Sequence, residues 1–157
     1  MPTTTTKQPV IFHTITFAQS NILLALAKYK FLTASQMAAL GIMSKTKNIN
    51  EALRELRWKK QQPLMAYQSF GTIPKVGKLE NIHYLTKYGK QALMNHLGLL
   101  PSEIKIPIGT STLFYQDYFH RKNTIDCEIS MNLWAESSNL EIPLCTRYFD
   151  KEGNNRR

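Results

Sequence analysis

The sequence has few cysteines and no long apolar run. Its two cysteines, Cys127 and Cys145, are too few for a disulfide framework and lack the spacing of zinc ligands, so they fit a reducing compartment. A membrane-spanning helix needs about 20 apolar residues, and no such run is present. The first residues also lack the apolar stretch of a signal peptide. These absences predict a cytoplasmic protein with no membrane partner.

The motifs of several enzyme classes are missing as well. The four histidines, His13, His83, His96 and His120, show no H-x-E, H-E-x-x-H or paired-ligand spacing. There is neither a glycine-rich phosphate loop nor a G-x-S-x-G serine elbow. The sequence therefore argues against a metal site built from this chain alone, and it identifies no catalytic nucleophile.

Acidic residues are scarce in the first part of the chain. Residues 1–100 contain 13 lysines and arginines against three acids, whereas residues 101–157 contain 7 basic and 8 acidic residues. The formal net charge of +9 therefore comes from the first two-thirds of the 157 residues. Such an asymmetry is typical of a nucleic-acid-binding unit joined to a unit with another role.

Helix signals are clear in this basic part. The capping-box patterns Thr16–Gln19 and Thr33–Gln36 open apolar-periodic runs that end near Tyr29 and at Gly41. A third helix is indicated by an apolar stripe that ends before Pro63 and consists of Ile49, Ala52, Leu53 and Leu56. Three helices, the last two joined by a short glycine-containing turn, predict a helix-turn-helix.

A hairpin and a closing helix are expected next. Residues 64–70 and 81–85 read as short strands, and the turn-rich loop between them carries Lys75 and Lys78. Residues 86–98 resume helical character. A helix-turn-helix followed by a hairpin with a basic tip predicts a winged helix over residues 16–98, preceded by a disordered arm at 1–15.

The remaining residues predict the start of a second unit. Residues 99–111 contain prolines and a glycine and suggest a linker. Residues 112–137 contain neither proline nor glycine and predict one long helix, apolar on two sides, followed by a strand at 141–149. The overall fold class is therefore α+β. So little chain cannot cover both sides of the helix, so we expect a partner chain there or a domain cut off after its first helix and strand.

The third helix supplies the candidate DNA contacts, because its polar and basic residues lie opposite the apolar stripe. Arg54 suits a guanine edge and Asn50 an adenine edge, while the lysines suit phosphates. The predicted DNA-binding residues are Lys45, Lys47, Asn50, Arg54, Arg57, Lys75 and Lys78. The alternative is a solvated helix face on which Glu51 forms ion pairs with Arg54 or Arg57. We expect Trp58 to pack over the hairpin, and four other aromatic residues to lie in the core: Tyr67, Phe70, Tyr84 and Tyr88.

Four runs of the sequence, at 22–40, 52–57, 84–93 and 119–129, resemble the replication-relaxation family of plasmid proteins. Some members look like MobC-type mobilisation relaxases, which join a winged helix to a nuclease domain related to the PD-(D/E)XK fold. The resemblance implies a protein that binds double-stranded plasmid DNA at the origin of transfer. It also implies that the full-length protein nicks one strand with a divalent metal, magnesium or manganese.

The resemblance places a metal ligand at Asp126 or Glu128, on the early helix of that nuclease domain. The E-x-K element expected later in the domain is absent, so we expect this chain to need no cofactor and to bind DNA without cleaving it. The alternative function is that of a transcription regulator similar to the MarR or PadR proteins. Such a regulator would form a homodimer through the helix at 112–137.

Overall fold

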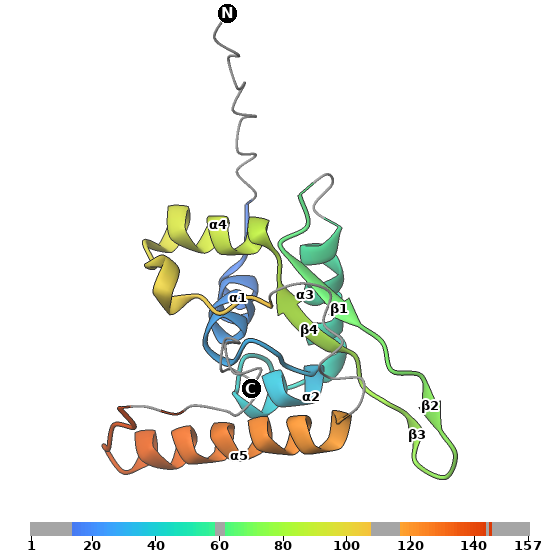
Figure 1. Ribbon diagram of the computed structural model, residues 1–157. Helices are drawn as coiled ribbons and strands as arrows, with labels where there is room; N and C mark the ends of the chain where they lie inside the picture. Colours follow the sequence, from blue (N-terminus) through green and yellow to red (C-terminus); the bar gives the residue numbers. More distant parts are fainter. Residues whose placement is uncertain (1–13, 59–61, 108–116, 144, 146–157) are drawn as a thin grey trace, which may run out of the picture.

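The computed structural model describes residues 14–58, 62–107, 117–143 and 145. These residues form an α+β structure of five α-helices and two small antiparallel sheets, of which the β2–β3 sheet projects away from the helices (Figure 1). The elements in chain order are α1 (Phe17–Tyr29), α2 (Ala34–Ala39), α3 (Thr46–Arg57), β1 (Met65–Gln68), β2 (Thr72–Ile73), β3 (Gly77–Lys78), β4 (Ile82–Leu85), α4 (Lys87–Leu97), a 3₁₀ turn η1 (Pro101–Glu103) and α5 (Tyr118–Ser137).

The first two helices begin where the capping boxes predict. The Gln19 backbone N–H donates to Thr16 Oγ1 (3.2 Å), and the Thr16 N–H donates to Gln19 Oε1 (3.0 Å). Thr33 and Gln36 repeat this pair of bonds at the start of α2. These bonds satisfy backbone donors that have no partner within the helix, so the sequence fixes both starting points.

Gly41 ends α2 as predicted. Its φ of +75° lies in the left-handed region that glycine adopts without a Cβ clash. The Gly41 N–H donates to Ala38 O (2.9 Å), and the Ile42 N–H donates to Met37 O (3.3 Å). This pair of bonds is the Schellman motif, and it turns the chain toward α3.

The apolar stripe of α3 packs on α1 and α2. The predicted residues Ile49, Ala52, Leu53 and Leu56 are all buried. A polar contact adds to this packing, because Gln19 Nε2 on α1 donates to Glu55 Oε2 (2.6 Å). The opposite side of α3 consequently faces outward, in contact with neither helix.

The hairpin has an inner and an outer part. In the inner part β1 pairs with β4, with Met65 opposite Leu85, and Leu32 forms an additional antiparallel bridge to His83. In the outer part β2 pairs with β3, with Thr72 opposite Lys78. We call residues 71–79 the outer hairpin. Its strands of two residues each are too short to show an alternating pattern, which is why the sequence predicted a loop there.

Gly89 allows the helix α4 to pack closely against the backbone at Leu64, just before β1. An added Cβ at Gly89 would lie 1.9 Å from the Leu64 carbonyl oxygen, so no larger residue fits without moving the backbone. The Gly89 N–H also donates to Thr86 Oγ1 (3.2 Å), which caps α4. The close contact fixes the position of α4 against the beginning of β1.

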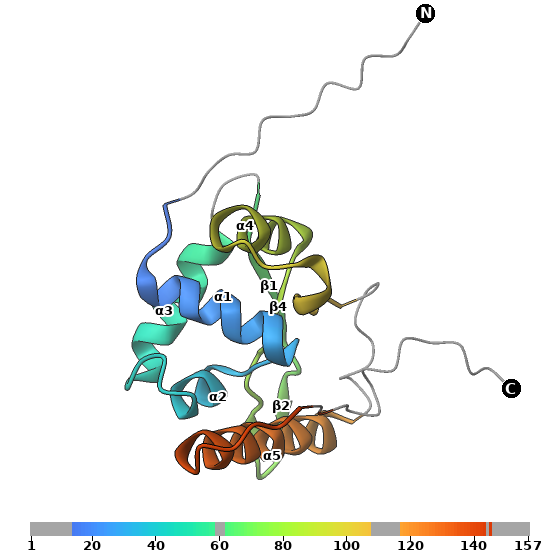
Figure 2. The same ribbon diagram turned by 90° about the vertical axis from the view of Figure 1, so that its left-hand side faces the viewer.

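The helix α5 shares the core of the preceding elements. Tyr118, Ile125 and Ile129 are buried in the same apolar cluster as the inward residues of α1, α2 and α3. Figures 1 and 2 both show α5 alongside α2. Ile104, in the predicted linker, is also buried in this cluster, and the Lys105 N–H donates to Ala27 O (3.0 Å).

Two predicted boundaries near the end of the chain differ from the structure. The helix begins at Tyr118, because the Asp117 backbone is not helical (φ −142°, ψ 37°), and residues 112–116 lie outside the described part. Residues 141–143 and 145 form no strand, and Pro143 has no N–H to donate to a ladder. The rest of the predicted strand and most of the predicted arm at 1–15 also lie outside the described residues.

Candidate nucleic-acid interface

The outward side of α3 brings together three of the predicted contacts. Lys47, Asn50 and Arg54 are exposed and line one shallow pocket. Their spacing of three and four residues places them on one face of the helix. Lys45 is exposed at the N-cap position of α3, where its side chain makes no capping bond.

The cations of α3 are not paired with the neighbouring acid. No ion pair within 4.0 Å joins Glu51 to Arg54 or Arg57 among the described residues. The Arg57 guanidinium instead lies 4.4 Å from the centre of the Tyr67 ring on β1, a cation–π contact. The geometry therefore does not support the alternative in which ion pairs neutralise this face of α3. The contact with Tyr67 places Arg57 at the border between α3 and the hairpin.

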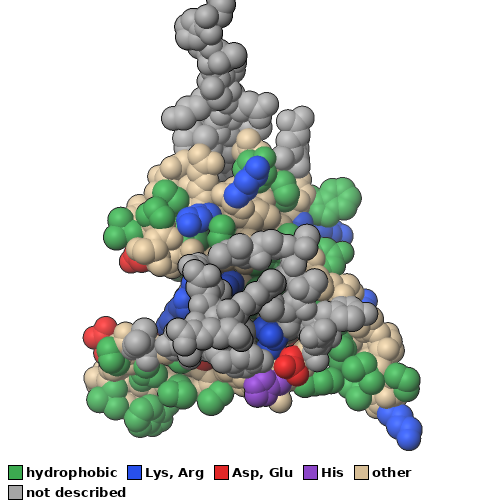
Figure 3. Space-filling model, in the orientation of Figure 1, with side chains coloured by type: hydrophobic (Ala, Val, Ile, Leu, Met, Phe, Trp, Pro, Cys, Tyr) green, Lys and Arg blue, Asp and Glu red, His purple; other side chains and the backbone are tan. Residues whose placement is uncertain are grey.

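The outer hairpin carries the other two predicted cations. Lys75 and Lys78 are both exposed, and Lys75 sits in the turn with a φ of +66°. Figure 3 shows a lysine or arginine side chain projecting from the tip of this hairpin. Lys78 and Asn50 line one pocket, so the base of the hairpin and α3 converge while Lys75 lies further out.

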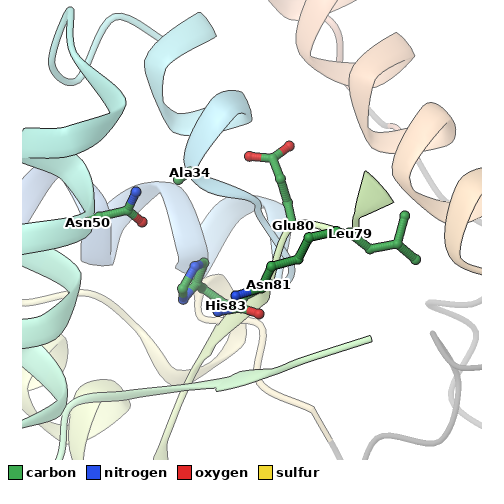
Figure 4. A pocket seen from close by; sticks show the side chains of 7 residues that line it. Ala34, Asn50, Leu79, Glu80, Asn81 and His83 are labelled. Carbon is green, nitrogen blue, oxygen red and sulfur yellow. The ribbon is translucent and has the colours of Figure 1, made fainter. Parts of the chain in front are cut away.

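Sequence reasoning missed a polar cleft between α3 and β4. Two adjoining pockets share Asn50, Asn81 and His83, and we call this region the α3–β4 cleft. Figure 4 shows the Asn50 side chain pointing from α3 toward the space beside His83 and Asn81. Asn81 is the residue before β4 and His83 is the second residue of the strand, and nothing in the sequence showed that this part of the hairpin meets α3.

The polar atoms of the α3–β4 cleft are incompletely satisfied. His83 is only 3% exposed, and its Nδ1 has no hydrogen-bond partner among the described residues; Asn81 Oδ1 is likewise buried and has no partner there. Burial, assisted by the nearby Arg57 charge, lowers the pKa of His83 to about 4. The imidazole is therefore neutral near pH 7.

The aromatic predictions are partly wrong. Trp58 is 77% exposed rather than packed over the hairpin, because α3 ends at Arg57 and Trp58 leaves the helical path. Tyr67 is 45% exposed and supports Arg57. The other three aromatics predicted for the core, Phe70, Tyr84 and Tyr88, are partly buried against it.

The predicted metal ligands lie on α5 without a cluster of donors. Asp126 Oδ1 accepts from Gln36 Nε2 (2.8 Å), and Asp126 Oδ2 pairs with Lys122 Nζ (2.9 Å). Glu128 is 6% exposed and points to a different side, since residues two apart on a helix are separated by about 200°. No group of three histidine, cysteine or acidic side chains comes together in the described part of the chain. Asp126 therefore has an amide and an ammonium group as its partners, and a metal ligand at Asp126 or Glu128 stays a prediction.

Comparison with known proteins finds no match for this chain. The chain matches no protein-family model, no curated protein sequence and no solved structure. Within the described residues, no helix combines the length and apolar character needed to cross a bilayer. The resemblance to the replication-relaxation family accordingly stays a prediction.

Proposed function

We propose that this protein binds double-stranded DNA as a winged helix. In this proposal α2 and α3 form the helix-turn-helix, α3 enters the major groove, and the outer hairpin is the wing. The observation that carries the proposal is the outward face of α3, where Lys47, Asn50 and Arg54 are exposed together and form no ion pair with any described acid. The basic outer hairpin extends beside the same face.

The side chains divide naturally between base and backbone contacts. Arg54 and Asn50, in the middle of the exposed face, suit the edges of guanine and adenine. Lys45 and Lys47 at the start of α3, with Lys75 and Lys78 on the wing, suit phosphates. Arg57 contributes from the border between these two groups, where Tyr67 holds its guanidinium.

A charge-matched pair of variants tests this proposal. Lys47→Ala together with Arg54→Ala removes two cations from the proposed interface, and we expect duplex affinity to fall about tenfold or more. Lys28→Ala together with Lys87→Ala removes two exposed cations from α1 and α4 and serves as the control. Fluorescence anisotropy with a labelled short duplex is the measurement. Equal affinities for the two double variants would overturn the proposal.

The proposed setting is plasmid mobilisation, and it rests on the resemblance of the sequence runs alone. The chain would then recognise the origin of transfer for strand nicking by the full-length protein. We expect no relaxed product from residues 1–157 on supercoiled plasmid with magnesium or manganese. A nicked product that disappears with chelator would show that these residues include a complete catalytic centre.

A second candidate, a dimeric transcription regulator, is favoured by the outer side of α5. Phe119, Met131 and Trp134 are 47%, 47% and 62% exposed there, and Figure 3 shows hydrophobic side chains along this edge. Exposed apolar side chains gathered on one helix are typical of a protein-binding surface. Light scattering distinguishes the candidates, because a regulator dimerising through α5 would be a tight dimer that Trp134→Ala weakens.

A further inference from the structure

The α3–β4 cleft is lined by two residues with buried polar atoms that have no hydrogen-bond partner in the described part of the chain. These atoms are His83 Nδ1 and Asn81 Oδ1, and both residues line the two pockets of the cleft. An unsatisfied buried polar atom destabilises the folded state, so folded proteins seldom retain one without a functional reason. One of these atoms lies on β4 and the other on the residue before it, and a group bound in the cleft can complete their hydrogen bonding when the two side chains turn toward it.

The charges around the cleft favour an anion as the missing group. Lys47, Arg54 and Arg57 line its α3 side, and Lys78 lines its hairpin side. Glu51 lines the α3 side and Glu80 the hairpin side, where Glu80 Oε1 accepts from Ser35 Oγ (2.6 Å) and keeps its negative charge. The four cations therefore outnumber the two acids that line the cleft, which attracts a negatively charged group.

The place of the cleft in the fold identifies the source of the anion. If α3 lies in the major groove and the wing approaches the neighbouring minor groove, the sugar–phosphate strand that separates the two grooves passes between them. The α3–β4 cleft lies between these two elements. The inference thus rests on the proposed function and adds a specific contact to it.

We propose that the α3–β4 cleft binds one phosphate group of the DNA backbone, with Asn81 and His83 as hydrogen-bond donors and the surrounding cations as counter-charges. Rotation of the Asn81 amide by 180° turns its NH₂ toward the phosphate without moving the strand. The neutral His83 imidazole donates through one ring N–H. The contact sets the depth at which α3 inserts into the major groove, but it does not distinguish one base from another.

Side-chain NMR on the unmodified protein tests the contact directly. A short duplex, inorganic phosphate and a mixture of deoxynucleosides are titrated separately, while the Asn50 and Asn81 side-chain amides, the His83 imidazole and the α3 backbone amides are followed. We expect the duplex to shift the cleft signals and the α3 signals with one common Kd. We also expect inorganic phosphate to shift the cleft signals weakly, and deoxynucleosides to leave them unchanged.

The other outcomes separate the two proposals. Duplex-induced shifts on α3 with unchanged Asn81 and His83 signals would overturn the phosphate contact and leave DNA binding intact. Shifts with deoxynucleosides but not with phosphate would overturn it in favour of a base edge. A response to inorganic phosphate without any response to duplex would reject the DNA source together with the proposed function. No response to any probe would overturn both.

A pair of near-isosteric variants provides an independent readout. Asn81→Asp places a negative charge in the cleft, and we expect it to lower duplex affinity about tenfold. Gln91→Glu adds the same charge on the exposed side of α4 and should leave affinity nearly unchanged. Thermal unfolding of both variants checks the fold. Equal affinities for two folded variants would overturn the phosphate contact, and if Asn81→Asp does not fold, the NMR titration decides alone.

Discussion

The helices α3 and α5 are both packed on the same core, yet they relate to it differently. On α3 the buried residues form one apolar stripe and the outward face is polar and basic. On α5 the buried face includes Arg121 (7% exposed) and Glu128 (6%), while Met131 and Trp134 face outward. A helix with one apolar side is positioned by its own pattern, whereas a helix with two depends on which neighbours are present.

Polar contacts help to decide which side of α5 is buried. Tyr118 Oη donates to the Glu80 carbonyl oxygen (3.0 Å), and Asn132 Nδ2 donates to Tyr29 Oη (3.0 Å). Between them, Gln36 Nε2 donates to Asp126 Oδ1. These three contacts join α5 to the hairpin, α1 and α2, so its attachment does not rest on apolar packing alone.

The largest expected effects come from truncating one core residue on each of the two helices and comparing the free energies of unfolding. Leu53 on α3 and Ile125 on α5 are 1% and 0% exposed, and truncating either to alanine removes buried methyl groups and leaves a cavity. We expect each variant to lower the free energy of unfolding by about 2–5 kcal/mol. Denaturant titration measures both. A negligible effect of Ile125→Ala beside a large effect of Leu53→Ala would show that α5 is not part of the cooperative core.

Acid sensitivity on the α3 side comes from His83. Because burial lowers its pKa from 6.5 to about 4, the folded state disfavours the protonated form. Its contribution to stability is therefore present above pH 6.5 and is lost as pH falls toward 4, by up to about 3 kcal/mol. Thermal unfolding between these pH values should show this loss in the wild type and in the exposed control His96→Gln. The loss should be absent in His83→Gln, and its persistence there would assign it to other groups.

Alkaline sensitivity on the α5 side comes from Tyr118. Burial, assisted by the nearby Glu80 and Asp126 charges, raises its pKa to about 12, so the folded state favours the neutral phenol. The resulting stability is complete below pH 10 and decreases as pH rises from 10 to 12. Tyr118→Phe should cost about 1 kcal/mol at neutral pH through the lost bond to Glu80 O, and should remove the alkaline decrease. An unchanged alkaline unfolding profile in Tyr118→Phe would contradict this assignment.

The smallest expected effect concerns the exposed ion pair of α5. Asp126→Asn removes the charge that pairs with Lys122 but keeps an oxygen that can accept from Gln36. The loss should be about 0.5 kcal/mol and should vanish at high salt, as for other i,i+4 pairs. Asp126→Ala, which also breaks the bond from Gln36, should cost more. Equal costs for the two variants would mean that the bond to Gln36 adds nothing.

The sequence predicted the elements whose signals are local. The capping boxes and Gly41 act within four or five residues, so they located α1 and α2 before any tertiary contact was known. The start of α5 was placed too early because residues 112–117 include neither proline nor glycine, and Asp117, a residue type common at N-caps, was not recognised as the start. Trp58 was misplaced because its direction depends on where α3 ends, a boundary that periodicity defines poorly.

The candidate site was predictable along α3 but not across the cleft. The amphipathic pattern alone placed Lys47, Asn50 and Arg54 on the outward face. The contribution of Asn81 and His83 depends on the packing of β4 beside α3, which joins residues about thirty positions apart. Their unpartnered atoms follow from burial, and burial becomes visible only in three dimensions.

The salt dependence of duplex binding tests the central claim most directly. If Lys47 neutralises a DNA phosphate while Arg54 contacts a base edge, the slope of log K against log salt should become shallower by about 1 in Lys47→Ala/Arg54→Ala. The control Lys28→Ala/Lys87→Ala, with the same net charge, should keep the wild-type slope. Equal slopes for the wild type and both double variants, or no salt-dependent binding at all, would contradict the assignment of this face to DNA.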